Sequence, residues 1–218
     1  MKKNAARNPQ QSQARILEAA LKEFAAKGFD GARVDAIARK ARINKRMLYH
    51  YFGDKEGLFR EVLRRKMEER ALWAASAPED PVDSLPYWFR LACGDTDWVR
   101  LLEWEALQRG QQKITDQAHR QKNATRALER LRRLQAAGRV SDRYDPGQLL
   151  LSMIALTAYP SAFPQVVRLI TGRDVSDKVF QAERVNFLRQ FASCFKLGKA
   201  GDSRGLKAQA NSHSSSPK

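Results

Sequence analysis

The sequence predicts an all-α chain of about nine helices, arranged as a three-helix helix-turn-helix head and a C-terminal domain of about six helices. Apolar residues recur at intervals of three and four, Gly and Pro residues separate these periodic segments, and no segment alternates with period 2 between hairpin turns. The clearest apolar stripes are Leu17, Ala20, Leu21 and Phe24 near the start and Phe187, Leu188, Phe191 and Phe195 near the end. Hydrophobic residues make up 43% of the 218 positions, which is enough to bury a core and excludes wholesale disorder.

Two short helices joined by a tight turn are predicted between residues 34 and 52. The first, Val34 to Lys40, has a single apolar face, and a break follows near residues 42–43. Asn44 stands where an N-cap belongs, because its side chain can accept a hydrogen bond from an amide two or three residues further on. The second helix runs from about Lys45 to Phe52, with Leu48 facing inward. Two helices with apolar residues on their inner sides form a helix-turn-helix.

The outer side of this motif is strongly basic. Lys45, Arg46, Tyr49 and His50 project from the second helix, and residues 33–46 hold six Lys and Arg against one acid. A recognition helix reads base edges in the major groove with its first residues, and surrounding cations contact phosphates. The pattern therefore favours binding to double-stranded DNA over the alternative, a solvated basic face on a packing motif.

The overall composition agrees with an anionic partner and excludes several other classes. The chain has 40 Lys and Arg against 24 Asp and Glu, a formal charge of +16, which indicates nucleic acid first and an acidic membrane surface second. The two cysteines, Cys93 and Cys194, form no CxxC, and the three histidines are far apart, so we expect no metal site and no cofactor. The motifs GxSxG, HExxH, GxGxxG and the P-loop lysine are absent, so no enzyme is predicted.

The run from Gly28 to Phe59 resembles the N-terminal domain of the tetracycline-repressor (TetR) family of bacterial transcription regulators. The shared motifs are I-A-x-x-A at 37–41, L-Y-x-Y-F at 48–52 and D-K-E-x-L at 54–58, and the resemblance covers about residues 11–65. It implies a homodimer that binds a palindromic operator, usually as a repressor, and leaves DNA when a small molecule binds the helical C-terminal domain. A nonspecific architectural DNA-binding protein, and an activator or ligand-independent regulator with the same head, stay open as alternatives.

Carried over by position, the resemblance implies nine DNA-contacting residues. Tyr51 and Lys55 would contact phosphates, and four residues of the second helix would face the groove: Lys45, Arg46, Tyr49 and His50. Arg33 adds a phosphate-reaching group, Arg42 adds a cation at the DNA side, and Asn44 is the N-cap. The full set is Arg33, Arg42, Asn44, Lys45, Arg46, Tyr49, His50, Tyr51 and Lys55. Two positions depart from the family pattern: Arg33 replaces a capping Ser or Thr, and Arg42 replaces the turn glycine. The Arg at 42 argues against a strongly positive φ there.

The part of the chain beyond residue 70 is expected to bind a ligand and to pair with a second copy of the chain. All four tryptophans fall between residues 73 and 104, which indicates either an aromatic pocket for an apolar ligand or plain packing. The candidate pocket residues are Trp88, Trp98, Trp104, Met153 and Tyr159. Segments 146–167 and 180–195 are expected to be the last two long helices, which pair with those of a partner in this family, with a kink or break at Pro160 and Pro164.

The expected boundaries are a flexible N-terminus over 1–10, the head over 11–56, the ligand-binding and dimerisation domain over 57–197, and a disordered basic tail over 198–218. The uncharged stretch 146–167 contains three prolines and several polar residues, so it is not expected to span a membrane. The basic N-terminus lacks the apolar run of a signal peptide. We therefore expect a cytoplasmic, nucleoid-associated protein that does not bind membranes.

Overall fold

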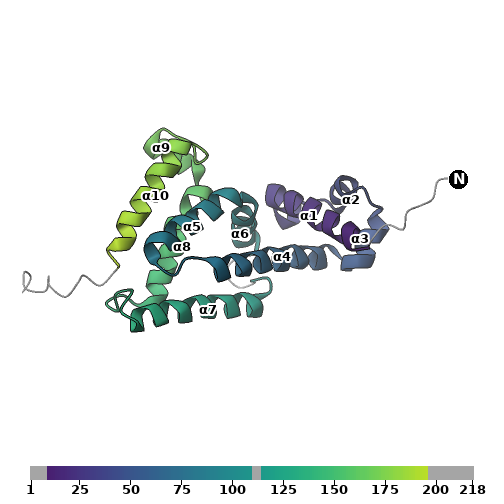
Figure 1. Cartoon of the computed structure of the whole chain (residues 1–218). Helices are drawn as coiled ribbons and strands as arrows, with labels where there is room; N and C mark the ends of the chain where they lie inside the picture. The colour runs from purple at the N-terminus through teal and green to yellow at the C-terminus, as the bar shows by residue number, and fades with distance from the viewer. Residues whose placement is uncertain (1–8, 110–113, 196–218) are drawn as a thin grey trace, which may run out of the picture.

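The computed structural model describes residues 9–109 and 114–195, and within these ranges it contains helices and no strands (Figure 1). The all-α prediction is confirmed, with one helix more than the nine expected. The helices are α1 Pro9–Gly31, α2 Val34–Ala41, α3 Lys45–Phe52, α4 Lys55–Ser76, α5 Pro81–Gly94, α6 Thr96–Arg109, α7 Gln117–Ala136, α8 Pro146–Ala162, α9 Pro164–Thr171 and α10 Lys178–Ser193. Helix α1 begins two residues before the predicted head boundary, and the predicted tail lies outside the described residues.

The helix starts follow from aspartates and prolines in the sequence. Four helices begin after an aspartate whose side chain accepts a hydrogen bond from an amide in the first turn, which is the usual N-cap arrangement. These caps are Asp54 for α4, Asp80 for α5, Asp145 for α8 and Asp177 for α10. In α5 and α8 the residue after the cap is a proline, whose missing N–H costs nothing in a first helical turn. Local chemistry thus sets where these helices begin.

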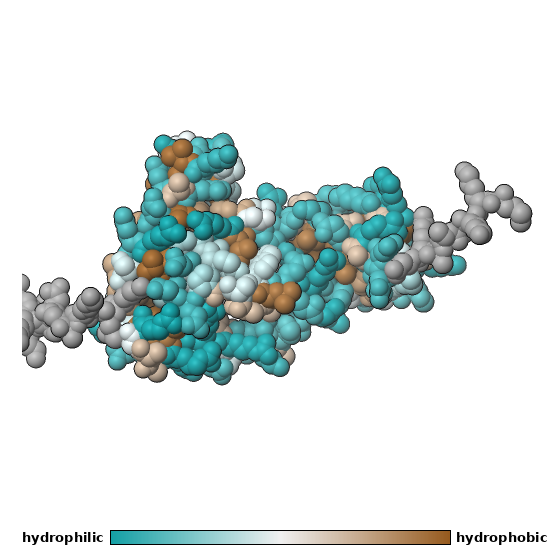
Figure 2. All heavy atoms as spheres, in the orientation of Figure 1, coloured by the Kyte–Doolittle hydropathy of each residue, from teal (hydrophilic) through white to brown (hydrophobic). Residues whose placement is uncertain are grey.

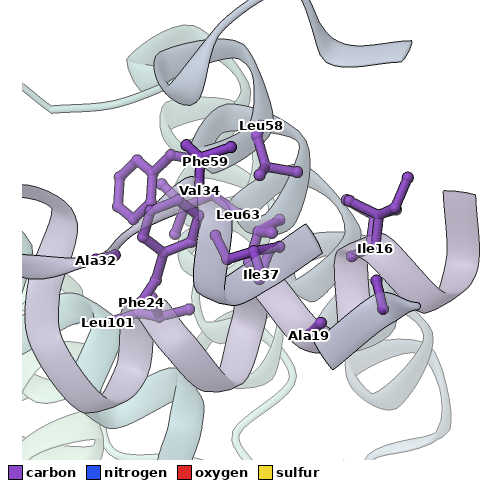
Figure 3. Close-up of a cluster of buried hydrophobic side chains, with 14 of the residues drawn as sticks. Ile16, Ala19, Phe24, Ala32, Val34, Ile37, Leu58, Phe59, Leu63 and Leu101 are labelled. Carbon is purple, nitrogen blue, oxygen red and sulfur yellow. The ribbon is translucent and has the colours of Figure 1, made fainter. Parts of the chain in front are cut away.

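Helices α1 to α3 and the start of α4 form the head around one apolar core (Figure 3). Phe24 of α1 is fully buried, and its ring meets the ring of Phe59 edge-on at 5.0 Å. Ile37 of α2 and Leu48 of α3 are also fully buried in this core. Because each of the four helices contributes apolar side chains, none of them can keep its place without the others.

Helix α4 leads from the head into the body (Figure 1), and helix α6 returns from the body to pack against α1. The body has a second core, built from α5, α7, α8 and α10. Its fully buried members include Leu85 and Phe89 of α5 and Leu188 of α10. The chain therefore has two cores, and α4 and α6 are the helices that join them.

Segment 146–167, predicted to be a helix with a kink or break at Pro160 and Pro164, is divided into two helices. Helix α8 ends at Ala162, Phe163 is non-helical with φ −125° and ψ 64°, and α9 begins at Pro164 with a bend of 85° between the two helices. The residue before a proline is pushed out of the helical region by the proline ring, so the break falls at Phe163. The predicted break at Pro164 is thus confirmed, whereas Pro160 lies inside the last turn of α8.

Pro160 leaves one carbonyl of α8 without its helical donor, and a side chain of α10 donates to that carbonyl instead. A residue at position 160 would normally donate its N–H to the carbonyl of Leu156, but proline has no N–H. Instead, the guanidinium of Arg184 on α10 donates to the Leu156 carbonyl at 2.9 Å. This hydrogen bond joins α8 to α10 and opposes sliding of one helix along the other.

Large apolar side chains lie exposed on the α8 to α10 end of the body. Leu151 and Ile154 of α8 are 61% and 54% exposed, and Phe187 of α10 is 44% exposed. Figure 2 shows apolar side chains among polar ones at this end of the molecule. No single helix in the described ranges is both long and apolar enough to cross a membrane, and α8 and α9, which reach that length together, are sharply bent.

Candidate nucleic-acid interface

Helix α3 is a short rod whose start and inner side are both fixed. The Asn44 side chain accepts a hydrogen bond from the backbone N–H of Arg46 at 2.9 Å, which confirms the predicted N-cap. Leu48 is fully buried beneath the helix in the head core, and Ile43 and Phe52 pack against the same core. The outer side chains therefore project from a rigid base.

The predicted groove-facing residues all lie on the exposed side of α3. Lys45, Arg46, Tyr49 and His50 are exposed, and so is Met47, which the sequence analysis did not single out. The signal for Met47 was available, because it lies three residues before His50, and helical spacing therefore places these two side chains on the same face of α3. An apolar Met at this place can contact a thymine methyl, while Lys and Arg can donate to guanine O6 and N7.

The turn before α3 corrects one prediction. Arg42 has φ 53° and ψ 48°, the left-handed conformation that its side chain was expected to disfavour. Its N–H donates to the carbonyl of Arg39 at 3.1 Å, and the N–H of Ile43 donates to that of Ala38 at 3.0 Å. These bonds satisfy carbonyls at the end of α2 and offset a strain of roughly 1–2 kcal/mol. The turn keeps the glycine geometry, and the exposed Arg42 side chain adds a cation beside α3.

The start of α2 supplies a further cation and an acidic partner. Arg33 is the N-cap residue of α2 but makes no capping hydrogen bond with its side chain, which is exposed. Asp35, two residues further along the chain, forms an ion pair with Lys45 at 2.9 Å. The hydrogen bond to Asp35 raises the pKa of Lys45. Because an exposed ion pair contributes little to stability, Lys45 can exchange this partner for DNA at low cost.

Two predicted phosphate contacts are partly engaged within the head. Tyr51 is half-buried and packs against the head core beside Phe52. The ammonium of Lys55 donates to the carbonyl of Asp30 at 3.2 Å and lies 4.9 Å from the centre of the Phe29 ring. These two residues therefore tie α3 and α4 to the rest of the head, which sets them apart from the freely exposed residues of α3.

A buried carboxylate joins α1 to α2 behind the DNA-facing surface. Glu23 is 1% exposed, and its two oxygens accept hydrogen bonds from Lys27 and Lys40, both at 2.7 Å. Burial acts to raise the pKa of Glu23, but the two ammonium groups outweigh it and lower that pKa to about 2. Lys40 therefore serves the packing of the head.

We expect acid to destabilise the head through Glu23. A carboxyl that titrates near 4.5 in the unfolded chain and near 2 in the folded one adds stability above about pH 4.5, and this is lost as the pH falls toward 2. Urea denaturation between pH 6 and about 2.5 should show Glu23→Gln to be less stable than the parent at neutral pH, by about 1–3 kcal/mol. The difference should shrink toward low pH. The exposed Glu18→Gln on the same helix is the control, and a constant difference at all pH values would contradict the assignment.

The head is joined to the body by side chains of α6. The indole N–H of Trp104 donates to the carbonyl of Ala25 at 3.2 Å, and the Gln108 side chain accepts from the amide of Phe29 at 2.8 Å. Gly28, in the left-handed region at φ 70°, lies under both side chains, where a Cβ atom would come within 2.8 Å of each. This close approach requires glycine, and it places α6 directly on the end of α1.

The five residues predicted to line a pocket do not gather in one place. Trp98 is buried in the head core, Trp104 lies against α1, and Tyr159 is 48% exposed beside Phe163. Trp88 and Met153 are half-buried in the body. A small cavity lies between α1 and α4, and its lining contains none of the five. The cavity is lined by Leu17, Glu18, Leu21, Val62, Arg65, Lys66 and Glu69.

Among residues 9–109 and 114–195, no three His, Cys, Asp or Glu side chains lie close enough together to hold a metal ion. The exposed side of α3 instead carries hydrogen-bond donors whose positions are set by a short, anchored helix. This arrangement can read base edges and neutralise phosphates.

Comparison with known proteins matches both parts of the chain. A family model described as bacterial regulatory proteins, tetR family, matches residues 16–62, which contain α2, the turn and α3. A model described as a tetracyclin repressor-like C-terminal domain matches residues 87–193. Both the resemblance of the head and the expectation of a helical C-terminal domain are therefore confirmed.

Individual proteins agree. The HTH-type transcriptional repressor SCO4008 of Streptomyces coelicolor is 37% identical over 171 residues, which are 77% of this chain and 88% of that protein. The HTH-type transcriptional repressor NicS of Pseudomonas putida is 52% identical over 48 residues, 22% of this chain and 23% of that protein. The crystal structure of SCO4942 from Streptomyces coelicolor matches with a TM-score of 0.71 at 27% identity, covering 83% of this chain and 97% of that one. The chain therefore belongs to the tetR family of bacterial regulatory proteins and is a DNA-binding transcriptional regulator rather than an enzyme.

Proposed function

We propose that the protein is a homodimeric repressor that binds a palindromic operator and is released from it by a small molecule. The observation that carries the proposal is the capped, core-anchored helix α3 with Lys45, Arg46 and Tyr49 exposed along it. The relative SCO4008, which this chain matches over most of its length, is named a repressor. Such a protein works on chromosomal DNA, so we place it in the cytoplasm, at the nucleoid.

The exposed apolar side chains of α8 and α10 support the homodimer. Leu151, Ile154 and Phe187 are large, and exposed apolar patches of this kind mark interaction sites. A two-fold arrangement buries the same patch on both copies. It would also place two α3 helices on one face of a duplex, where half-sites about one helical turn apart can be read together.

The contacts between head and body support control by a ligand. Because α6 is bonded to the end of α1 through Trp104 and Gln108, a change in the position of α6 reaches the head directly. A ligand that binds better to one arrangement of these helices shifts the population toward it, with a coupling of about 1–3 kcal/mol. Of the five predicted pocket residues, Trp88 and Trp98 both lie beside Arg70 and are the ones kept in this proposal.

Selection of binding sites from random DNA with the purified chain, followed by gel-shift titration, tests the operator. The proposal expects an enriched inverted repeat, bound at least about 10³-fold more tightly than random DNA at physiological salt. Equal affinity for all sequences would instead indicate the architectural alternative. A reporter gene placed behind the selected site then separates repression from activation.

Within that assay we expect Arg46→Ala to weaken binding to the selected operator by about 1–3 kcal/mol and to relax the sequence preference at one base pair of each half-site. The reason is that a guanidinium on the first turn of α3 can donate two hydrogen bonds to one guanine. Fluorescence anisotropy over a set of single-base operator variants measures both effects. Arg132→Ala, an exposed arginine on α7 with the same loss of charge, is the control. Uniform weakening across all variants would make Arg46 a phosphate contact.

A further inference from the structure

Arg70 of α4 lies in a cluster of three tryptophans where α4, α5 and α6 meet. The centre of its guanidinium is 5.8 Å from the ring of Trp73, 5.7 Å from that of Trp88 and 5.3 Å from that of Trp98. We call these four residues the Arg70 cluster. Each tryptophan comes from a different helix, so the side chain of Arg70 is enclosed from three directions.

Of two cations on α4 at the Arg70 cluster, Lys66 forms ion pairs and Arg70 forms none with a described residue. Lys66, one turn earlier on α4, is buried and holds both Asp95 and Glu69 at 2.9 Å. Arg70 has neither an ion pair nor a hydrogen bond within the part of the chain that the structure describes. Burial lowers the pKa of Arg70, although the charge of Asp95 opposes this effect. The cluster thus holds a partly exposed cation without a carboxylate partner in the described ranges, since Asp95 binds Lys66 through Oδ1 while its Oδ2 is buried without a hydrogen-bond partner there.

This combination suits one chemical class of ligand. A guanidinium offers five N–H donors in a flat fork that matches the two oxygens of a carboxylate, and such paired bonds are among the strongest in proteins. Tryptophan faces accept the apolar or aromatic body of a small molecule. We propose that the Arg70 cluster binds a small organic carboxylate, with the carboxylate on Arg70 and the apolar body against the tryptophans.

A cationic ligand fits the same residues less well. The tryptophan faces attract cations, but Arg70 already occupies that position, and a second positive charge would be repelled by it. An uncharged aromatic ligand would cover the partly exposed guanidinium of Arg70 without offering its donors an acceptor, and removing these donors from water in this way is costly. A carboxylate supplies the missing acceptor and neutralises the charge.

The Arg70 cluster lies where the body meets the head. That a ligand bound there would regulate DNA binding rests on the proposed function. Trp98 belongs to the head core, and α4 continues from Arg70 into the head. A ligand on Arg70 would therefore touch both helices that join the head to the body. Binding itself can be measured without DNA, so the two proposals can fail separately.

Isothermal titration calorimetry on the full chain tests the site with three probes of the same shape: 2-naphthoate, neutral 2-naphthamide and cationic 2-naphthylmethylammonium. We expect the naphthoate to bind at least about 10-fold more tightly than either of the others, since only it can pair with Arg70. Arg70→Met should abolish this preference. Arg132→Met on α7, which removes one exposed arginine, should keep it.

The outcomes are distinct. Equal affinity for naphthoate and naphthamide, tightest binding of the ammonium, an unchanged naphthoate affinity in Arg70→Met, or no saturable heat up to about 10 mM naphthoate would each overturn the proposal. If circular dichroism shows that Arg70→Met does not fold, Arg70→Lys replaces it. That variant keeps the charge but not the fork, and it should lose several-fold in affinity. Unchanged affinity in Arg70→Lys would also count against the site.

A final arm measures operator binding by anisotropy with and without naphthoate. A loss of operator affinity supports both the site and ligand control. Naphthoate that binds through Arg70 without changing operator affinity supports the site and counts against control from it. A chain that selects no operator, yet binds naphthoate through Arg70, upholds this inference and overturns the repressor proposal.

Discussion

Phe24→Ala is expected to lower the free energy of unfolding by about 3–5 kcal/mol, because it removes a fully buried ring from the centre of the head. Its ring packs against Phe29 and Phe59, so the truncation leaves a cavity that α1 and α4 both border. The base of α3 belongs to the same core. We therefore also expect operator affinity to fall steeply near the lowered melting temperature. Urea denaturation followed by far-ultraviolet circular dichroism measures the stability.

Leu72→Ala on α4 is the matched control for this truncation. Leu72 is 71% exposed, so its replacement should change the free energy of unfolding by less than about 0.5 kcal/mol. If Phe24→Ala costs no more than Leu72→Ala, the packing of the head core described above is wrong.

The second large effect concerns the exposed apolar face of the body. Replacing both Ile154 and Phe187 with Glu should convert the proposed dimer into monomers, because each copy would bring charges into an interface that must exclude water. Losing two central apolar contacts typically costs at least about 2 kcal/mol each, which is more than a 100-fold weaker dimer. Native mass spectrometry over a range of protein concentrations measures the change.

Operator binding should weaken when dimerisation is lost, because a monomer carries only one α3 helix. Leu72→Glu, which adds charge on α4 instead, should leave the mass of the assembly unchanged. A double variant that stays dimeric would place the interface elsewhere, and a parent chain that is monomeric at all concentrations would contradict the homodimer itself.

The ends of the head helices could be predicted because short-range chemistry decides them. The predicted end of α2 differs by one residue from the observed one, and α3 begins and ends as predicted, because a side-chain cap at Asn44 and a glycine after Phe52 act on their immediate neighbours. The exposure of Arg46 and His50 could be predicted because each lies two residues from the buried Leu48, which is about 200° around the helix.

Features that depend on distant partners were not predictable in the same way. The tryptophans were grouped by their closeness in sequence, but Trp98 and Trp104 lie on different sides of α6 and contact the head. The left-handed turn at Arg42 is imposed by the docking of two helices on α1 and α4, which outweighs the local preference of arginine. For α8, the two prolines predicted an interruption, but only the structure shows that Pro164 breaks the helix while Pro160 stays within it, where a side chain of α10 donates to the carbonyl that Pro160 leaves free.

The hydrogen bonds that Gln108 accepts from backbone amides at the end of α1 affect how the head can move. Gln108 accepts from Phe29 at 2.8 Å and, more weakly, from Asp30 at 3.4 Å. If α6 slid by a fraction of a turn, these amides would lose their acceptor before another side chain came within reach. A displacement of α6 that opens these bonds therefore leaves backbone donors unpaired, so the orientation of the head is tied to the position of α6.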